Sequence, residues 1–113
     1  MGSDLQEIEV GIQTAKDDVA IRDAIDRLMR NRDFKKVFVD GYFKDEAVRV
    51  VMLKAAPALQ TDADQKALDD RILAISTLQL YLHSKARVGD MAEKAIADNE
   101  KERELLLAEE AAE

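Results

Sequence analysis

Residues 62–107 read DADQKALDDRILAISTLQLYLHSKARVGDMAEKAIADNEKERELLL and contain no proline. As one helix, this stretch would extend roughly 65–70 Å at 1.5 Å per residue, whereas a compact domain of about 100 residues has a radius of gyration of only ~13 Å. Its apolar residues recur at three- and four-residue or seven-residue spacing, which places them on one helix face: Leu68, Ile72, Ile75, Leu78, Leu82, Ala86, Gly89 and Ile96. We therefore expect a very long C-terminal helix that projects beyond the fold, breaks, or is covered by other chains.

Capping patterns mark the start of this helix and one point inside it. Thr61 and Asp62 are its expected caps, and Asp62-Ala63-Asp64-Gln65 forms a capping box. Asp90-Met91-Ala92-Glu93 forms another box directly after Gly89, which makes Gly89 the place for a kink or break. The alternative is a continuous helix in which Gly89 lets another backbone approach.

A long N-terminal helix is predicted over residues 3–30. Ser3 and Gln6 form a capping box at its start. Its apolar residues lie at helical spacing in two successive registers: Leu5, Ile8, Ile12, Ala15 and Val19, then Ile21, Ile25, Leu28 and Met29. Together with the long C-terminal helix, it indicates a helical hairpin or bundle.

Two short helices are predicted between the long ones. The first covers residues 33–40, with Asp33 as its cap and Gly41 as a left-handed C-terminal residue. The second covers residues 44–56 and is stopped by Pro57. Their expected inward faces are apolar: Phe34, Val37 and Phe38 in the first, and Val48, Val51, Met52 and Ala55 in the second. The predicted fold is thus all-α, with one helical domain over residues 1–113 and the last helix over 62–112.

Composition restricts the classes of function. Charged residues make up 36% of the 113 residues, above the ~25% of typical globular chains, and long exposed helices provide the surface that they need. The net charge of -7 argues against a general nucleic-acid ligand, because such binding depends on neutralising phosphates. The chain has no cysteine, signal peptide or membrane span, so we expect a cytoplasmic protein.

The residues needed for catalysis are sparse. His83 is the sole histidine, and Leu80 stands where the Glu-x-x-His pattern of helical di-metal sites needs a glutamate. Neither a glycine-rich phosphate loop nor a nucleophile elbow is present. We therefore predict no enzymatic activity, no metal and no cofactor.

Three groups of residues are candidates for partner binding. A basic group surrounds the first turn of the chain, and it is either a docking patch or ordinary charge at a helix C-terminus: Arg27, Arg30, Arg32, Lys35 and Lys36. Tyr42 and Phe43 are either an exposed anchor or a plug between helices. The third group is apolar and would stay uncovered by a 28-residue first helix: Met91, Ile96, Leu105, Leu106 and Leu107. The last of these lie in an acidic tail, residues 98–113, which is either a solvated helix end or a partner-binding segment.

The stretch NRDFKKVFVDGYFKDEAVRVVMLKAAPALQ, residues 31–60, followed by a long helix and a charged tail, resembles small acidic helical proteins of tailed bacteriophages. These proteins are encoded near head and tail morphogenesis genes, so the resemblance implies a virion-associated or assembly protein. It carries no motif with a chemical role, and no functional residue follows from it.

The expected function is that of a helical interaction protein that forms a homo-oligomer or joins a larger protein assembly. In phage terms it would be a scaffold, ring or head–tail component. The alternative is a regulator or inhibitor that binds a host enzyme or the nucleic-acid machinery through acidic faces.

Overall fold

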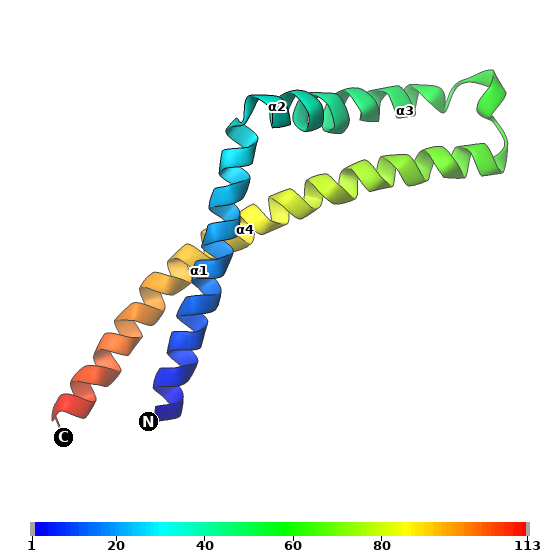
Figure 1. Ribbon diagram of the computed structural model, residues 1–113. Coiled ribbons are helices and arrows are strands. Elements are labelled where there is room, and N and C mark those ends of the chain that lie inside the picture. The colour runs from blue at the N-terminus through cyan, green and yellow to red at the C-terminus, as the bar shows by residue number, and fades with distance from the viewer. Residues whose placement is uncertain (1, 113) are drawn as a thin grey trace. The chain divides into compact units, whose positions relative to one another are not determined.

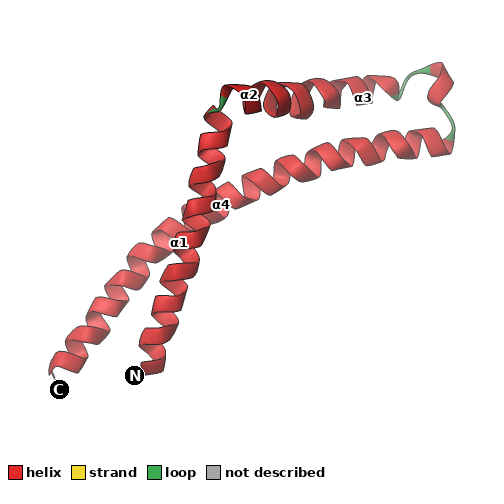
Figure 2. Cartoon of the chain, viewed as in Figure 1, coloured by secondary structure: helices red, strands yellow, loops and turns green. Residues whose placement is uncertain are grey.

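Nearly all of the residues that the structure describes, 2–112 in a computed structural model, are helical, and none of them lies in a strand (Figure 2). This confirms the all-α prediction with its very long last helix. In chain order the elements are α1 (Gly2–Arg30), α2 (Arg32–Phe34), the π-helix η1 (Lys35–Glu46), α3 (Ala47–Leu53), the 3₁₀-helix η2 (Pro57–Leu59) and α4 (Asp62–Ala112) (Figure 1).

The chain forms two compact units. The terminal unit consists of the described residues of Met1–Ile25 and Ser84–Glu113, and the central unit of Asp26–His83. Each unit therefore contains a different part of α4.

In the terminal unit, the first part of α1 lies antiparallel to the last part of α4 (Figure 1). Arg22 contacts Asp90 and Glu93, while Gly11 lies near Asn99, so rising residue numbers on α1 meet falling ones on α4. The buried residues of this unit belong to both helices: Ile8, Ile12, Ala15 and Ile25 on α1, and Ala92 on α4. The predicted inward face of the first helix is thus confirmed over its main register. In the second register, Ile21 is exposed.

The helix α4 continues through Gly89 without a break. Gly89 is buried, and a Cβ atom at this position would overlap the Cβ of Arg22. Only glycine therefore permits this approach between the two helices. The alternative, in which Gly89 admits a neighbouring helix, matches this geometry.

In the central unit, the chain enters a new helix at Asn31, whose extended backbone ends α1. The Asn31 side chain accepts a hydrogen bond from the Phe34 amide at 2.9 Å, which is the N-cap arrangement. The prediction that Asp33 caps this helix is therefore wrong by two residues. Asp33 instead lies in the first turn, where its negative charge favours the helix dipole.

The predicted pair of short helices is a single helical run, in which α2, η1 and α3 follow one another without a loop (Figure 1). Gly41 does not end a helix, and no described residue has a positive φ. In the π-helix η1 each N–H bonds to the carbonyl five residues earlier. A Cβ at Gly41 would lie 2.9 Å from the Lys36 carbonyl oxygen, so the glycine fits the wider turn.

The π-helix also changes which side of α3 is buried. Because it has more residues per turn than an α-helix, it shifts the direction of every later side chain. Val50 is fully buried, whereas the predicted inward residues Val48, Val51 and Met52 are 58%, 51% and 70% exposed. The predicted face of the second short helix is therefore wrong. In the first, Val37 and Phe38 are exposed as well, and Phe34 is half-buried.

The turn between α3 and α4 is held by side-chain amides. Ala56 is extended before Pro57, and α3 ends at Leu53, three residues before the predicted end at residue 56. Gln60 and Gln65 both donate to the Lys54 carbonyl, at 2.9 and 3.0 Å. These bonds satisfy a carbonyl that has no partner at the helix end.

Thr61 caps the start of α4, because its hydroxyl accepts a hydrogen bond from the Asp64 amide at 3.0 Å. This confirms Thr61 as a cap. The capping box between Asp62 and Gln65 does not form, since Asp62 is already helical and the Gln65 side chain bonds to Lys54 and Leu59 carbonyls. Lys54 and Asp69 add an ion pair of 2.6 Å beside the turn.

Three residues form the buried centre of the central unit: Val50 on α3, and Leu68 and Ile75 on α4. Ile72 and Leu82 are half-buried, which confirms most of the predicted inner face of α4 in this unit. Leu78 departs from that pattern, with 37% of its surface exposed. The side of α4 that bears Leu68 and Ile75 is called its inner face below.

Candidate interaction surfaces

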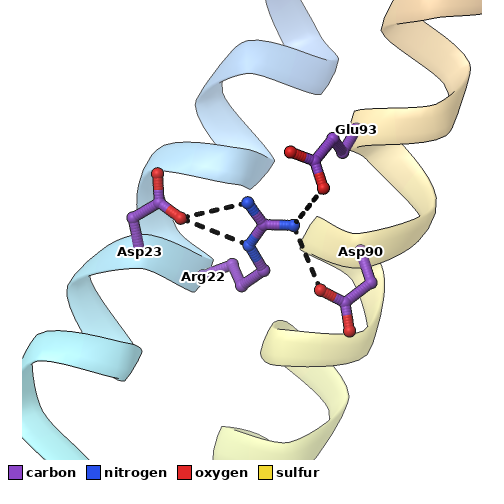
Figure 3. A network of polar contacts seen from close by, with 4 residues as sticks. All are labelled: Arg22, Asp23, Asp90 and Glu93. Atoms are coloured by element: carbon purple, nitrogen blue, oxygen red, sulfur yellow. Dashed lines mark hydrogen bonds and ion pairs between the residues drawn. The ribbon is translucent and has the colours of Figure 1, made fainter. Parts of the chain in front are cut away.

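Arg22 of α1 joins α4 in the terminal unit through Asp90 and Glu93, and it also pairs with Asp23 of α1 (Figure 3). Its Nη1 donates to Asp90 Oδ1 at 3.1 Å and to Glu93 Oε2 at 3.0 Å. Its Nε and Nη2 donate to Asp23 Oδ1 at 3.2 and 3.1 Å. The Arg22 side chain is only 14% exposed, while its three partners reach further into solvent.

The network keeps Arg22 charged and fixes the pairing of the two helices. The hydrogen bonds that Arg22 donates to Glu93 and Asp23 raise the pKa of Arg22 above its ordinary value. The aliphatic carbons of the Arg22 side chain lie against Gly89 of α4. Arg22 is absent from the sequence-based candidates because no local motif marks it. Its partners are 68 and 71 residues away, a separation that spacing within one helix cannot reveal.

A basic hollow of about 340 Å³ lies on the surface of the central unit. Four of the five predicted basic residues line it, namely Arg30, Arg32, Lys35 and Lys36, together with Asp40. All four cations are exposed, and none forms an ion pair with another residue that the structure describes. The structure thus gathers the predicted basic group except Arg27, which is exposed but does not line the hollow.

An aromatic row lies beside this hollow. Phe34 stacks on Phe38 with ring centroids 5.1 Å apart, Phe38 meets Tyr42 edge-on at 6.3 Å, and Tyr42 packs on Phe43 at 5.9 Å. Tyr42 and Phe43 are half-buried. A second hollow, of about 370 Å³, includes Phe38 and Tyr42 in its lining and shares Lys36 with the basic hollow.

The side of α4 away from its inner face is apolar within the central unit. Leu73, Leu80 and Tyr81 are 64%, 63% and 54% exposed, although they lie on the same helix as the buried Leu68 and Ile75. Leu73 and Tyr81 line a surface hollow of about 680 Å³ together with Asp70, Ala74, Thr77 and Leu78. We call the group Leu73, Leu80 and Tyr81 the outer face of α4.

The predicted apolar residues of the terminal unit differ in exposure. Met91 is 67% exposed and lines a groove between α1 and α4 with Gly11, Thr14, Ala15, Asp18, Val88, Ala92 and Ala95. Leu105 and Leu107 are 62% and 48% exposed. Ile96 and Leu106 are half-buried, so they contribute less surface to a partner than predicted.

Histidine and acidic side chains do not gather into a metal-binding cluster in the described part of the chain. His83 is exposed on α4, and no cluster of three or more histidine, cysteine or acidic side chains suited to a metal ion occurs among the described residues. None of the described helices combines the length and the apolarity needed to cross a bilayer.

Comparisons with protein-family models, with curated proteins and with solved structures each found no match to this chain. The surfaces described above are therefore interpreted from their own geometry and chemistry.

Sequence reasoning missed the outer face of α4 because it followed a single apolar stripe. Leu73 and Leu80 are seven residues apart, and Thr77 and Tyr81 fall between and beside them at four-residue spacing. This spacing predicts a second apolar face on the same helix. Its exposure, in contrast, follows from packing and needed the structure.

Proposed function

We propose that the protein is a non-enzymatic helical interaction protein that assembles through the outer face of α4. The observation that carries the proposal is the exposure of Leu73, Leu80 and Tyr81 on a helix whose inner face is already buried. Exposed apolar patches on proteins are commonly binding surfaces. A partner helix laid along this face would remove the patch from water.

Helix-on-helix packing suits the chemistry of this surface. The hollow on α4 contains small residues, Ala74 and Thr77, between larger apolar ones, Leu73 and Leu78. Ridges of a partner helix fit into grooves of this kind, and spacing of three and four residues is the spacing of coiled-coil seams. The proposed partner is a second copy of the chain or a helix of a larger assembly.

The resemblance of residues 31–60 to tailed-phage proteins suggests the setting. We propose a virion-associated or morphogenesis role, in which repeated copies of a helical chain build part of a particle. Such a role needs self-complementary or repeating interfaces rather than a catalytic site.

The proposal is tested with the double variant L73D/L80D and a matched control, V10D/V48D. Val10 and Val48 are 66% and 58% exposed and lie outside the outer face. Because charges on a buried interface lose hydration without gaining a partner, we expect L73D/L80D to abolish assembly in sedimentation experiments while its helical circular dichroism stays unchanged. The control should assemble as the wild type does. Equal behaviour of the two variants would refute the role of this face.

A further inference from the structure

The basic hollow in the central unit is lined by four cations and one carboxylate. Arg30, Arg32, Lys35 and Lys36 surround it, and only Asp40 in its lining is acidic. Their exposed and unpaired side chains leave a concentrated positive surface on a chain whose net charge is -7.

The opposite charge is found at the end of α4. Asp98, Glu102 and Glu109 are exposed and form no ion pair with any described residue. Their spacing, with Leu105 between the last two, places the four residues on one side of the helix. Leu105 is 62% exposed, so this side offers carboxylates around an apolar centre.

The two surfaces match in charge and in layout. The basic hollow adjoins the hollow of Phe38 and Tyr42, and Lys36 belongs to both. A helix bearing two glutamates and a leucine could place its carboxylates against the cations and its leucine against the aromatic rings. Paired charges around an apolar contact are a common arrangement of protein interfaces.

We propose that the basic hollow binds the acidic C-terminal segment of a second copy of this chain. The proposal rests on the proposed assembly function and adds a contact with its own chemistry. Since the two surfaces differ, each copy offers one hollow and one segment, and successive copies could be linked through them.

Charge reversal on either side tests the contact. K35E/K36E and E102K/E109K should each weaken self-association about tenfold or more, because attraction becomes repulsion at several exposed pairs. An equimolar mixture of the two variants should recover wild-type association, since each then offers the charge that the other lacks. Light scattering and sedimentation velocity measure both effects.

Matched controls keep net charge from explaining the result. K16E/K94E and E7K/E9K make the same changes in net charge at exposed positions of the terminal unit, and both should associate as the wild type does. Circular dichroism should show unchanged helicity in all variants. Raising the salt concentration from about 0.05 to about 0.5 M should weaken the wild-type contact, because salt screens exposed charges.

Several outcomes would overturn the proposal. One is that the mixture fails to associate, and another is that the control variants lose as much association as the test variants. Loss of assembly in L73D/L80D with none in the charge-reversed variants would refute this contact and leave the proposed function intact. Binding of an oligothymidine probe that is abolished by K35E/K36E, with self-association unchanged, would identify the hollow as a nucleic-acid site instead.

Discussion

The two units of the chain achieve helix packing in different ways. In the terminal unit, α1 and α4 approach closely at a glycine, and a nearly buried arginine of α1 bridges them through Asp90 and Glu93. In the central unit, a π-helix and side-chain amides at a turn set the direction in which apolar residues face α4 or solvent. Regular α-helical spacing therefore predicts the inward residues of α1 and α4 well, and those of the run from α2 to α3 poorly.

The largest difference in stability is expected inside the central unit, between alanine substitutions at two nearby residues of α4. Ile75→Ala should lower the free energy of unfolding by about 2–5 kcal/mol, because it removes buried methyl groups and leaves a cavity. Leu73→Ala, on the outer face, should change the stability of the single chain by no more than about 0.5 kcal/mol. Chemical denaturation at low protein concentration measures both. Similar losses at the two positions would mean that α4 does not have distinct inner and outer faces.

The close approach in the terminal unit is tested by a pair of glycines. Gly89→Ala should cost about 1–3 kcal/mol or more, because the new Cβ overlaps Arg22 and the helices must separate. Gly11→Ala places its Cβ 3.4 Å from the Asn99 side-chain nitrogen, which is ordinary contact. It should therefore stabilise the protein by up to about 1 kcal/mol through helix propensity. Thermal melts that show gains at both positions would contradict the close packing at Gly89.

These expectations show how much of the fold could be predicted from sequence. The face of Ile8, Ile12 and Ala15 follows from unbroken α-helical spacing, and the structure confirms it. The face of α3 could not be predicted, because the π-helix before it turns Val50 inward and Val48 outward. No local residue pattern marks a change from bonds four residues apart to bonds five residues apart.

The candidate surfaces also differ in whether they could be predicted from the sequence. The basic hollow was predictable because its four cations lie within seven residues of the chain, from Arg30 to Lys36. The Arg22 network was not, because it joins residues far apart in sequence.

A smaller change in stability is expected for Gly41→Ala. An α-helix and a π-helix predict changes of opposite sign at this position. In an α-helix, Gly41→Ala would add about 1 kcal/mol of stability. In the π-helix, the new Cβ meets the Lys36 carbonyl oxygen, so we expect no gain or a small loss in denaturant unfolding. A clear gain would contradict the π-helix and, with it, the explanation for the direction of Val50.

The smallest change in stability is expected for the ion pair of Glu46 and Arg49 in the central unit. This pair is more exposed to solvent than the Arg22 side chain is. Hydrogen bonds from Arg49 lower the pKa of Glu46, so the pair stabilises the fold above the unfolded-state pKa, and this contribution is lost as the pH falls through the folded-state pKa. Glu46→Gln should reduce stability slightly near pH 7, and the difference from wild type should shrink towards about pH 3. A difference that grows on acidification would contradict this assignment.

The central claim is that the exposed outer face of α4 makes this chain an assembly protein. The most direct test is the solution mass of the wild type, measured by light scattering across a range of protein concentrations. We predict a mass of at least twice the 12.7 kDa of one chain, rising with concentration. A mass of 12.7 kDa at every concentration would contradict self-assembly.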